Sequence, residues 1–386
     1  MKTGLWACSL FLAAGMGACG LEWEPLHDEF ITPQEVGSVE VAPLQEALTF
    51  ARFERDGDLH VLAVTLYEGG DVEGVDLSVA LGEPTMDPIS MFNAYGFEGI
   101  TEAIQRAVGR VTVAADSLVL PVELRSHHVA GGTNFPEHAA EAGVSEGPYL
   151  FPSLKAPTGP YANVPINKGL LDYEVELAWV TLDPVEEGTH PEHMGLLVCN
   201  DYTNREALLR HLDPNDVASG KGFPTGKSFP GYLPVGNLFV IPLDYRSFGE
   251  SIELELYLDR YLRQRAQVSR AVWGIEELLD ETWARSGVTW EHRGERYPLY
   301  DNTTIKDRTL VMSGTPPGVI FNEVGAEPRA SAFLDFVLGG WGETLPDHAI
   351  DDYIRDARAA GIYLMPGDEV LIRVDFLGVV RNEVVE

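Results

Sequence analysis

One stretch of alternating acidic and apolar residues, GLLDYEVELAWV at 169–180, constrains the fold more than any other feature of the sequence. Side chains of an extended chain point alternately to its two faces, so Asp172, Glu174 and Glu176 share one face of a strand. The opposite face is bulky, and the strand continues as LAWVTL, which favours burial on both sides. The chain therefore places a row of carboxylates on a strand of a sheet-based fold.

Such a row needs its charge compensated. Two ionised carboxylates two residues apart on a strand lie roughly 6.6 Å apart and repel by roughly 2–3 kcal/mol at an effective dielectric near 20. Either one of them is protonated, or both face water, or a divalent cation supplies the compensating charge. A further acid, Asp201, ends the apolar run GLLVCND. Glu174, Glu176 and Asp201 would offer three hard oxygen ligands to Mg²⁺ or Mn²⁺, whereas zinc favours His or Cys.

Length and charge limit the classes of protein that remain. The chain has 386 residues and is 45% hydrophobic, enough to bury a full core as one large domain or as a small domain plus a large one. Its 60 acidic and 27 basic residues give a formal net charge of −33. This balance argues against a nucleic-acid partner and against an anionic membrane surface. For most of the surface acids the simplest interpretation is a solvated face.

The N-terminus has the pattern of a secretory signal over residues 1–19. Lys2 precedes an apolar run, residues 5–14, that is too short to span a bilayer, and small residues lead to Cys19. The sequence MGAC resembles the lipobox of bacterial lipoproteins, with Met in place of the usual Leu, which implies lipidation of Cys19. Gly20 beside it favours the outer membrane. We expect a protein secreted across the inner membrane, as an outer-membrane lipoprotein or in the periplasm, with a lipid anchor as its only membrane contact.

The cysteines exclude a disulfide framework. Cys8 leaves with the signal and Cys19 is the lipidation candidate, so Cys199 has no partner for a disulfide. Cys199 lies in an apolar run, which favours a small buried core residue over a nucleophile.

Composition and periodicity divide the remaining chain into three parts. Residues 20–46 are acidic, contain proline and lack periodicity, so they are predicted to be a linker. Short alternating strands and one helix predict a small α+β domain over 47–124, and a larger strand-rich domain follows over 125–386. Four segments are predicted as helices: 99–109, 203–212, 274–285 and 348–360.

Several segments, read in order, are similar to the motifs of one family. They are GGTNFPEHAAEAG, LFPSLKAPT, LDYEVELA, NDYTNREA, GKSFPGYLPVG, LRQ, VMSGTPPGV and LMPGDEVLIRVDFLGVVRNEV. From about residue 47 to 386, the sequence resembles the fumarylacetoacetate hydrolase family. The resemblance implies a β-rich α+β fold, with a mixed-sheet β-sandwich or pseudobarrel core and a small N-terminal α+β domain. It also implies a homodimer.

The resemblance assigns the metal ligands and a catalytic pair. Glu174, Glu176 and Asp201 correspond to ligands of Mg²⁺ or Mn²⁺. His138 and Glu141 correspond to a His/Glu dyad, and residues three apart on a helical turn are neighbours. A carboxylate that orients an imidazole and raises its basicity makes a general base able to take a proton from water.

Four further residues match family positions at the substrate. Lys227 would stabilise the negative charge that develops on a substrate enolate. Thr315, with neighbouring backbone N–H groups, would bind the substrate carboxylate. Lys155 and Arg205 fit positions that line the pocket.

Other positions depart from the family pattern. The usual Gln, Asp and Met of the family are replaced by Leu208, Pro230 and Ala271. These replacements affect the choice of substrate more than metal binding. Longer insertions occur near 284–305 and 322–360, and either could form a lid or a subunit contact.

The resulting functional prediction is a metal-dependent hydrolase that cleaves a carbon–carbon bond in an acylpyruvate or related 1,3-diketo acid. Oxaloacetate decarboxylation, dienoate hydration or isomerisation on the same site is the alternative enzymatic prediction. A lipoprotein that binds a 2-oxo acid without turnover is the third. The presence of His138, Glu141 and Lys227 argues against pure binding, because a binder needs no group that activates water.

Overall fold

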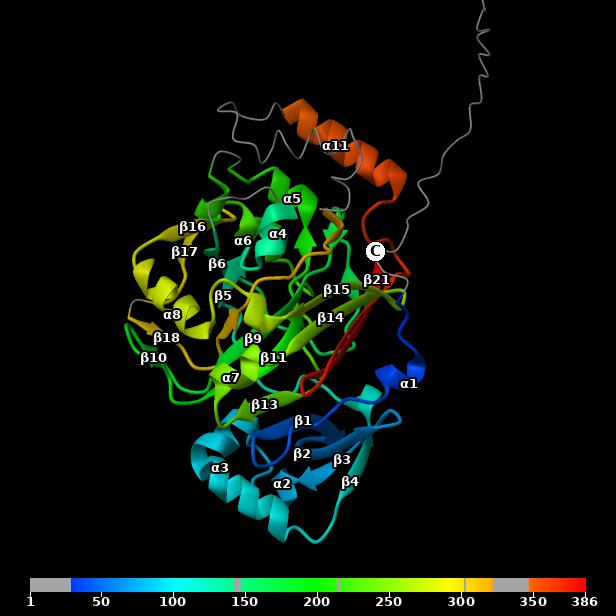
Figure 1. Ribbon diagram of the computed structural model, residues 1–386, viewed down its shortest axis with the longest axis vertical. Helices are drawn as coiled ribbons and strands as arrows, with labels where there is room; N and C mark the ends of the chain where they lie inside the picture. The colour runs from blue at the N-terminus through cyan, green and yellow to red at the C-terminus, as the bar shows by residue number, and fades with distance from the viewer. Residues whose placement is uncertain (1–28, 142–146, 214–215, 302, 322–346) are drawn as a thin grey trace, which may run out of the picture.

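The largest element is a ten-stranded sheet that runs through the molecule (Figure 1). The computed structural model describes residues 29–141, 147–213, 216–301, 303–321 and 347–386. The strands of the large sheet are β1 (Ala47–Arg55), β2 (Asp58–Glu68), β3 (Asp71–Asp76), β4 (Val111–Ala114), β5 (His128–Gly132), β6 (Tyr149–Ser153), β9 (Val175–Thr181), β11 (Met194–Asn200), β13 (Phe239–Pro242) and β19 (Leu310–Met312). Their order is β4-β3-β2-β1-β13-β11-β9-β19-β5-β6, and every pair is antiparallel except β19 with β5.

A five-stranded sheet packs against the large one. Its strands are β7 (Val164–Pro165), β14 (Glu253–Leu258), β15 (Tyr261–Gln267), β20 (Glu369–Val374) and β21 (Gly378–Val385), in the order β15-β14-β20-β21-β7. β14 contacts β9, and β21 contacts β11, so the two sheets face each other across a shared apolar core. This arrangement confirms the predicted strand-rich α+β fold with mixed sheets.

Short strand pairs complete the sheet structure. They are β8 (Leu171–Asp172) with β12 (Thr203–Asn204), β10 (Val185–Glu186) with β18 (Thr304–Ile305), and β16 (Thr289–His292) with β17 (Glu295–Pro298). The pair β16–β17 is formed by the predicted insertion near 284–305. The Trp290 indole N–H donates to the carbonyl of Ser219 at 2.9 Å, so this insertion is anchored to the body of the protein.

Helices lie mainly between strands and at the two ends of the molecule. They are α1 (Pro33–Val36), α2 (Leu77–Ala80), α3 (Pro88–Arg106), α4 (Pro136–Glu141), α5 (Arg205–Leu209), α6 (Phe223–Lys227), α7 (Tyr245–Glu250), α8 (Ile275–Ala284) and α11 (Asp347–Ala360), with 3-10 turns at Ala115–Ser117, Val217–Ser219 and Val268–Arg270. The four predicted helices are confirmed. α3 begins earlier than predicted, because a first helical piece, capped by Asp87 through the Ser90 N–H, joins the predicted segment at a kink where Gly96 adopts φ +66°.

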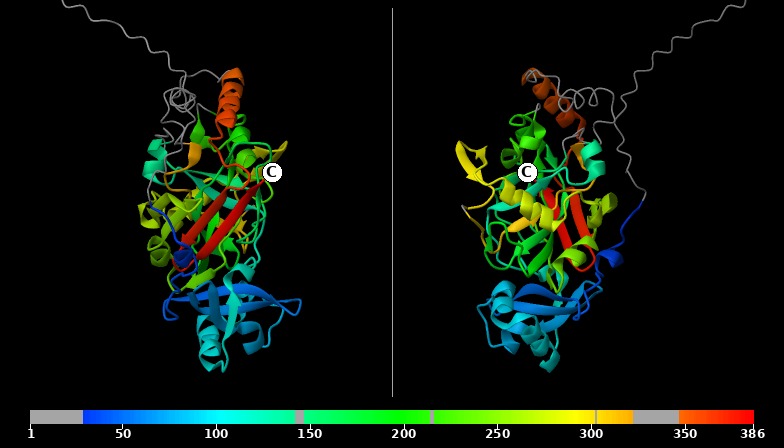
Figure 2. Two further views of the ribbon diagram at one scale, coloured as in Figure 1. Left: turned by 90° about the vertical axis from the view of Figure 1, so that its right-hand side faces the viewer. Right: turned by 60° about the vertical axis from the view of Figure 1, so that its left-hand side comes forward.

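The N-terminal strands extend the large sheet. β1 pairs with β13 in a register that sets Phe50 opposite Phe239. Both views of Figure 2 place β1 to β4 and α3 at one end of the molecule and α11 at the other. Within the predicted linker, the described residues pack against the body, with Ile31 and Val39 buried. The domain boundaries at 46 and 124 stay a prediction.

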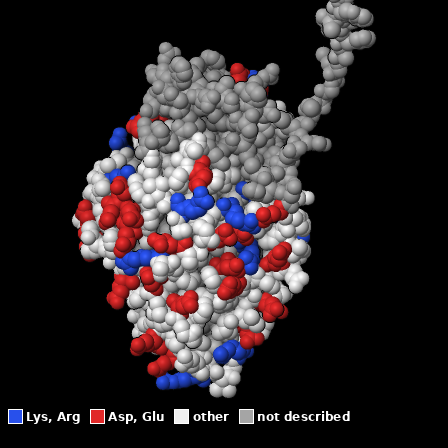
Figure 3. Space-filling view, in the orientation of Figure 1, with Lys and Arg blue, Asp and Glu red and all other residues white. Residues whose placement is uncertain are grey.

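Two sequence predictions fall outside the described residues. The signal segment with Cys19 lies before residue 29, and the second insertion is described only from residue 347 onward. No helix among the described residues is long and apolar enough to cross a membrane. Figure 3 shows acidic side chains spread among basic ones over the visible face.

Stability at acid pH is expected to depend on His128 in β5. Burial, together with the nearby charges of His127 and Lys155, lowers the pKa of His128 from 6.5 to about 3, and the Leu310 N–H donates to its Nδ1 at 3.1 Å. Below pH 6.5 the unfolded chain binds a proton there that the folded chain refuses, so stability is lost as pH falls. We expect a loss of about 1.6 kcal/mol between pH 6.5 and 5 from this residue.

The measurement is urea unfolding of the protein and of His128→Gln across this pH range. The Gln variant should lose less stability on acidification, whatever its stability at neutral pH. An identical slope in both proteins would assign the pH dependence to other groups.

Candidate metal centre

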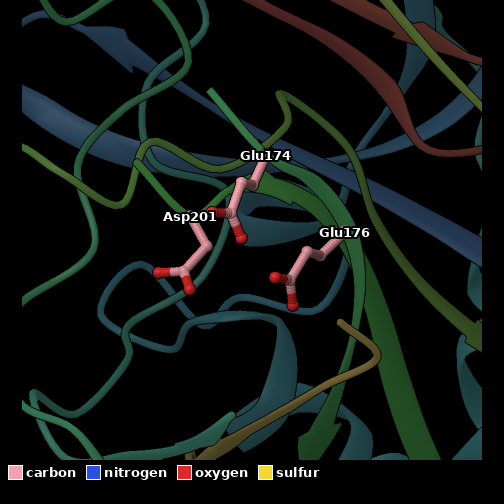
Figure 4. A group of neighbouring side chains, drawn as sticks. All are labelled: Glu174, Glu176 and Asp201. Atoms are coloured by element: carbon pink, nitrogen blue, oxygen red, sulfur yellow. The ribbon is translucent and has the colours of Figure 1, made fainter. Parts of the chain in front are cut away.

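The structure brings three buried carboxylates together at the junction of β9 and β11. These strands pair antiparallel with Glu176 opposite Cys199, so the start of β9 lies beside the end of β11. Glu174 directly precedes β9 and Asp201 directly follows β11. One oxygen from each of Glu174, Glu176 and Asp201 lies within 4.8 Å of the others, and Figure 4 shows the three carboxylates turned toward one space.

Two buried lysines compensate the charge of this carboxylate trio. Lys227, at the end of α6, places its Nζ 2.9 Å from Glu174 Oε2 and 2.7 Å from Asp201 Oδ2. Lys155, which follows β6, forms an ion pair with the other oxygen of Asp201. Both lysines are at least 95% buried. The predicted residues Lys155 and Lys227 therefore meet the predicted metal ligands directly.

The carboxylates of the trio differ in their affinity for protons. Burial raises the pKa of a carboxylate, but the adjacent Lys227 and Arg205 outweigh this effect at Glu174 and lower its pKa to about 2. Burial and the neighbouring Asp201 raise the pKa of Glu176 well above its ordinary value. Glu176 is therefore the carboxylate of this trio whose pKa rises when no cation is bound, whereas that of Glu174 falls.

The residues present fit a divalent cation. Glu176 Oε1 is buried and has no hydrogen-bond partner in the described part of the chain. A buried carboxylate oxygen without a donor is costly unless a cation meets it. Three carboxylates with no His or Cys form a hard oxygen set, which suits Mg²⁺ or Mn²⁺.

The predicted row of three acids divides between two tasks. Asp172 does not join the trio: its carboxylate accepts from Arg205 Nε at 2.8 Å and from the backbone N–H groups of Ile320 and Phe321 at 3.0 and 3.1 Å. Arg205 in turn donates to Glu174 Oε1 at 2.8 Å. Asp172 thus holds Arg205 and the segment at 320–321 in place beside the trio.

Thr315 lies near the trio through the loop after β19. The N–H of Gly314 donates to Glu176 Oε2 at 2.9 Å, and Gly314 adopts φ +79°, which favours glycine over other residues. Gln264 donates to Thr315 Oγ1 at 2.9 Å and accepts from the Val175 N–H at 3.0 Å. Gln264 therefore ties this loop to β9.

A pocket next to the trio contains most of the other predicted site residues. Its lining includes His138, Glu174, Arg205, Lys227 and Thr315. His138 lies on α4 and is close enough to Glu174 to lower its pKa. The predicted substrate residue Lys155 is absent from this described lining and lies behind it against Asp201.

Two predictions near the pocket have different outcomes. The side chain of Glu141 lies outside the described residues, so the His138–Glu141 dyad stays a prediction. Cys199 is fully buried and burial raises its pKa well above the ordinary value, which confirms the predicted core role.

Some contributors to the site had no assigned role in the sequence. They are Asp172 and Gln264, which position its parts, and the apolar pocket residues Tyr149, Phe151 and Phe223. The similarity of the LRQ segment to a family motif singled out Gln264, but it did not predict which residues Gln264 contacts. In the sequence, the three aromatic residues have the pattern of ordinary core positions. No feature of that pattern marks them as residues that line a pocket.

The model of the family described as fumarylacetoacetate (FAA) hydrolase C-terminal matches residues 127–385, about two thirds of the chain. The chain belongs to the fumarylacetoacetate hydrolase family. The match includes β9, β11 and the whole carboxylate trio. Family members of this kind are divalent-metal-dependent enzymes, and the buried trio agrees with that property.

Proteins similar to this chain are named for different reactions. Human mitochondrial oxaloacetate tautomerase FAHD2B is 24% identical over 282 residues, covering 70% of this chain and 69% of the relative. Maleylpyruvate hydrolase from Sphingobium sp. SYK-6 shares the fold with a TM-score of 0.52 at 19% identity, covering 88% of this chain and 99% of that structure. The 5-carboxymethyl-2-hydroxymuconate delta-isomerase from Mycobacterium smegmatis has a TM-score of 0.51 at 19% identity, with the same coverage.

Proposed function

We propose that the protein is a metal-dependent hydrolase that cleaves a carbon–carbon bond in an acylpyruvate or related 1,3-diketo acid. The observation that supports this most is the buried trio of Glu174, Glu176 and Asp201, whose Glu174 lines one pocket together with Lys227 and His138. Mg²⁺ or Mn²⁺ held by the trio would polarise the 2-oxo group of the substrate.

The side chains of the pocket fit the proton and charge transfers of this reaction. His138 takes a proton from water, whose oxygen adds to the acyl carbonyl carbon. The carbon–carbon bond then breaks, and its electron pair moves into the enolate of pyruvate. Lys227 faces that developing negative charge, while Thr315 and Arg205 orient the acid end of the substrate.

A second candidate function uses the same groups differently. Oxaloacetate tautomerisation or decarboxylation, dienoate hydration and isomerisation all pass through an enolate of a 2-oxo acid, and the relatives named for such reactions support this alternative. Binding of a 2-oxo acid without turnover is the third candidate. A protein that only binds a 2-oxo acid would not need a general base, so this candidate leaves His138 in the pocket without a role.

The experiment that separates these functions follows products. Protein expressed without residues 1–19 is incubated with acetylpyruvate, oxaloacetate or a dienoate, with Mg²⁺, Mn²⁺ or EDTA. The proposal predicts pyruvate release from acetylpyruvate that EDTA abolishes. Turnover of oxaloacetate alone would favour the second candidate, and metal-dependent binding without any product would favour the third.

Replacing His138 should separate metal binding from catalysis. In His138→Gln we expect the bound metal to be retained and pyruvate release to fall on the order of 10²–10⁴-fold, the usual contribution of a general base. Metal content is measured by atomic absorption and turnover by coupled pyruvate detection. Full activity in this variant would remove His138 from the reaction. His211→Gln, at an exposed position just after α5, is the control and should stay active.

A further inference from the structure

The wall of the pocket beyond the trio is apolar and aromatic. Tyr149 and Phe151 of β6 and Phe223 of α6 form a cluster, with ring centroids 5.2 Å apart for Tyr149–Phe223 and 4.9 Å apart for Phe151–Phe223. Leu208 and Leu209 of α5 and the following Leu212 line the same pocket. A substituent of a bound ligand that extends away from the trio therefore contacts apolar side chains on several sides.

Two short helices show the same spacing of a charged and an apolar side chain, in opposite order along the chain. On α5, Arg205 contacts Glu174, and Leu208 and Leu209 follow three and four positions later. On α6, Lys227 contacts Glu174, and Phe223 lies four positions earlier. Residues at these spacings occupy the same side of a helix, about 5–6 Å apart. Each helix thus places its cation against the trio and its apolar residue one turn away.

The two helices are packed too closely to be easily rearranged. A Cβ built on Gly226 of α6 would lie 2.7 Å from Leu208 Cβ of α5. The apolar wall is therefore a fixed surface of the pocket.

The cations of the described lining are already engaged near the trio. Arg205 pairs with Asp172 and Glu174, and Lys227 pairs with Glu174 and Asp201. The remaining basic side chain of that lining is His138. One carboxylate of a substrate can be recognised at this end of the pocket. A second carboxylate at the apolar wall would lose its hydration without gaining a cation from the described lining.

We infer that the substrate is a 2-oxo acid with a single carboxylate and an uncharged apolar group, alkyl or aryl, at its far end. This inference rests on the proposed function, because it takes the 2-oxo acid end to lie at the trio. The apolar group gains by leaving water for the wall of Phe151, Phe223 and Leu208.

The test measures binding without turnover. Oxamate, N-hexyloxamate and N-(5-carboxypentyl)oxamate are titrated calorimetrically into Mg²⁺-loaded and EDTA-treated protein. The last two ligands differ only in a terminal methyl or carboxylate. We expect N-hexyloxamate to bind on the order of tenfold or more tighter than both other ligands, and only in the loaded protein.

Each other outcome has a definite meaning. If the carboxypentyl ligand binds as tightly as the hexyl ligand or tighter, the inference is overturned while the 2-oxo acid site stands. If none of the three binds to protein that holds Mg²⁺, the proposed function fails and the inference fails with it.

A charge placed on the wall supplies the matched variant. Leu212 is only partly buried, so Leu212→Lys can be introduced with little disturbance, and Leu212→Met is its apolar control. Leu212→Lys should reverse the order of the hexyl and carboxypentyl ligands, and Leu212→Met should keep it. An unchanged order in Leu212→Lys would show that the substituent does not meet this wall, which contradicts the inference.

Discussion

Replacing Glu176 by Gln is expected to abolish stoichiometric binding of Mg²⁺ or Mn²⁺. Glu176 is buried, and its Oε1 has no hydrogen-bond partner among the described residues. Loss of a residue that only supports a ligand already costs about 10–100-fold in metal affinity, so loss of a ligand should cost about a hundredfold or more. Calorimetry with Mg²⁺ and electron paramagnetic resonance with Mn²⁺ measure this directly.

Proton release gives a second measure of the same event. Because burial and the neighbouring Asp201 raise the pKa of Glu176, metal binding to the unaltered protein should displace protons and strengthen as pH rises. The heat of binding should therefore depend on the ionisation enthalpy of the buffer. Glu291→Gln, at an exposed strand position, is the matched control and should bind normally. Unchanged stoichiometry in Glu176→Gln would refute the ligand assignment.

Replacing Lys227 by Met is expected to destabilise the metal-free protein strongly. Lys227 is 2% exposed and neutralises Glu174 and Asp201, so its removal leaves buried carboxylates without that partner. Removing one partner of a buried ion pair costs about 3–5 kcal/mol. Urea unfolding in EDTA measures the loss. Saturating Mg²⁺ should recover much of it, because a cation bound only by the folded state adds stability and replaces the missing charge.

Turnover should not recover with stability. Lys227→Met with bound Mg²⁺ still lacks the group that faces the enolate, and loss of one such donor costs about 10²–10³-fold in rate. Lys221→Met, at a lysine shortly before α6, is the control, since the Lys221 side chain is 62% exposed and pairs with Asp213 at the surface. Its effect on stability should be within about 1 kcal/mol. Equal stability of Lys227→Met and the unaltered protein in EDTA would contradict the charge balance described for the trio.

The sequence was sufficient to predict the trio because its signals are local. Glu174 and Glu176 alternate with apolar residues, which places them on one face of a strand, and Asp201 ends an apolar run, which places it at a strand end. The antiparallel pairing of β9 with β11 then joins them. The strand-rich fold and the four helices followed from periodicity in the same way.

Contacts between distant segments could not be predicted from such patterns. Alternation places Asp172 on the same face as Glu174, but β8 ends at Asp172 and β9 begins only at Val175, so the row breaks between them. Asp172 then meets backbone N–H groups 148 and 149 residues later in the chain. The extension of the large sheet through β1 and β13 is likewise non-local.

The central claim is that Glu174, Glu176 and Asp201 hold a divalent cation to which a 2-oxo acid binds. Crystals grown with Mn²⁺ and pyruvate, measured for anomalous scattering from manganese, test it most directly. The account predicts one strong anomalous peak in contact with all three carboxylates, with the 2-oxo acid beside it. A map without a peak there, with Lys227 still against Asp201, would contradict the account.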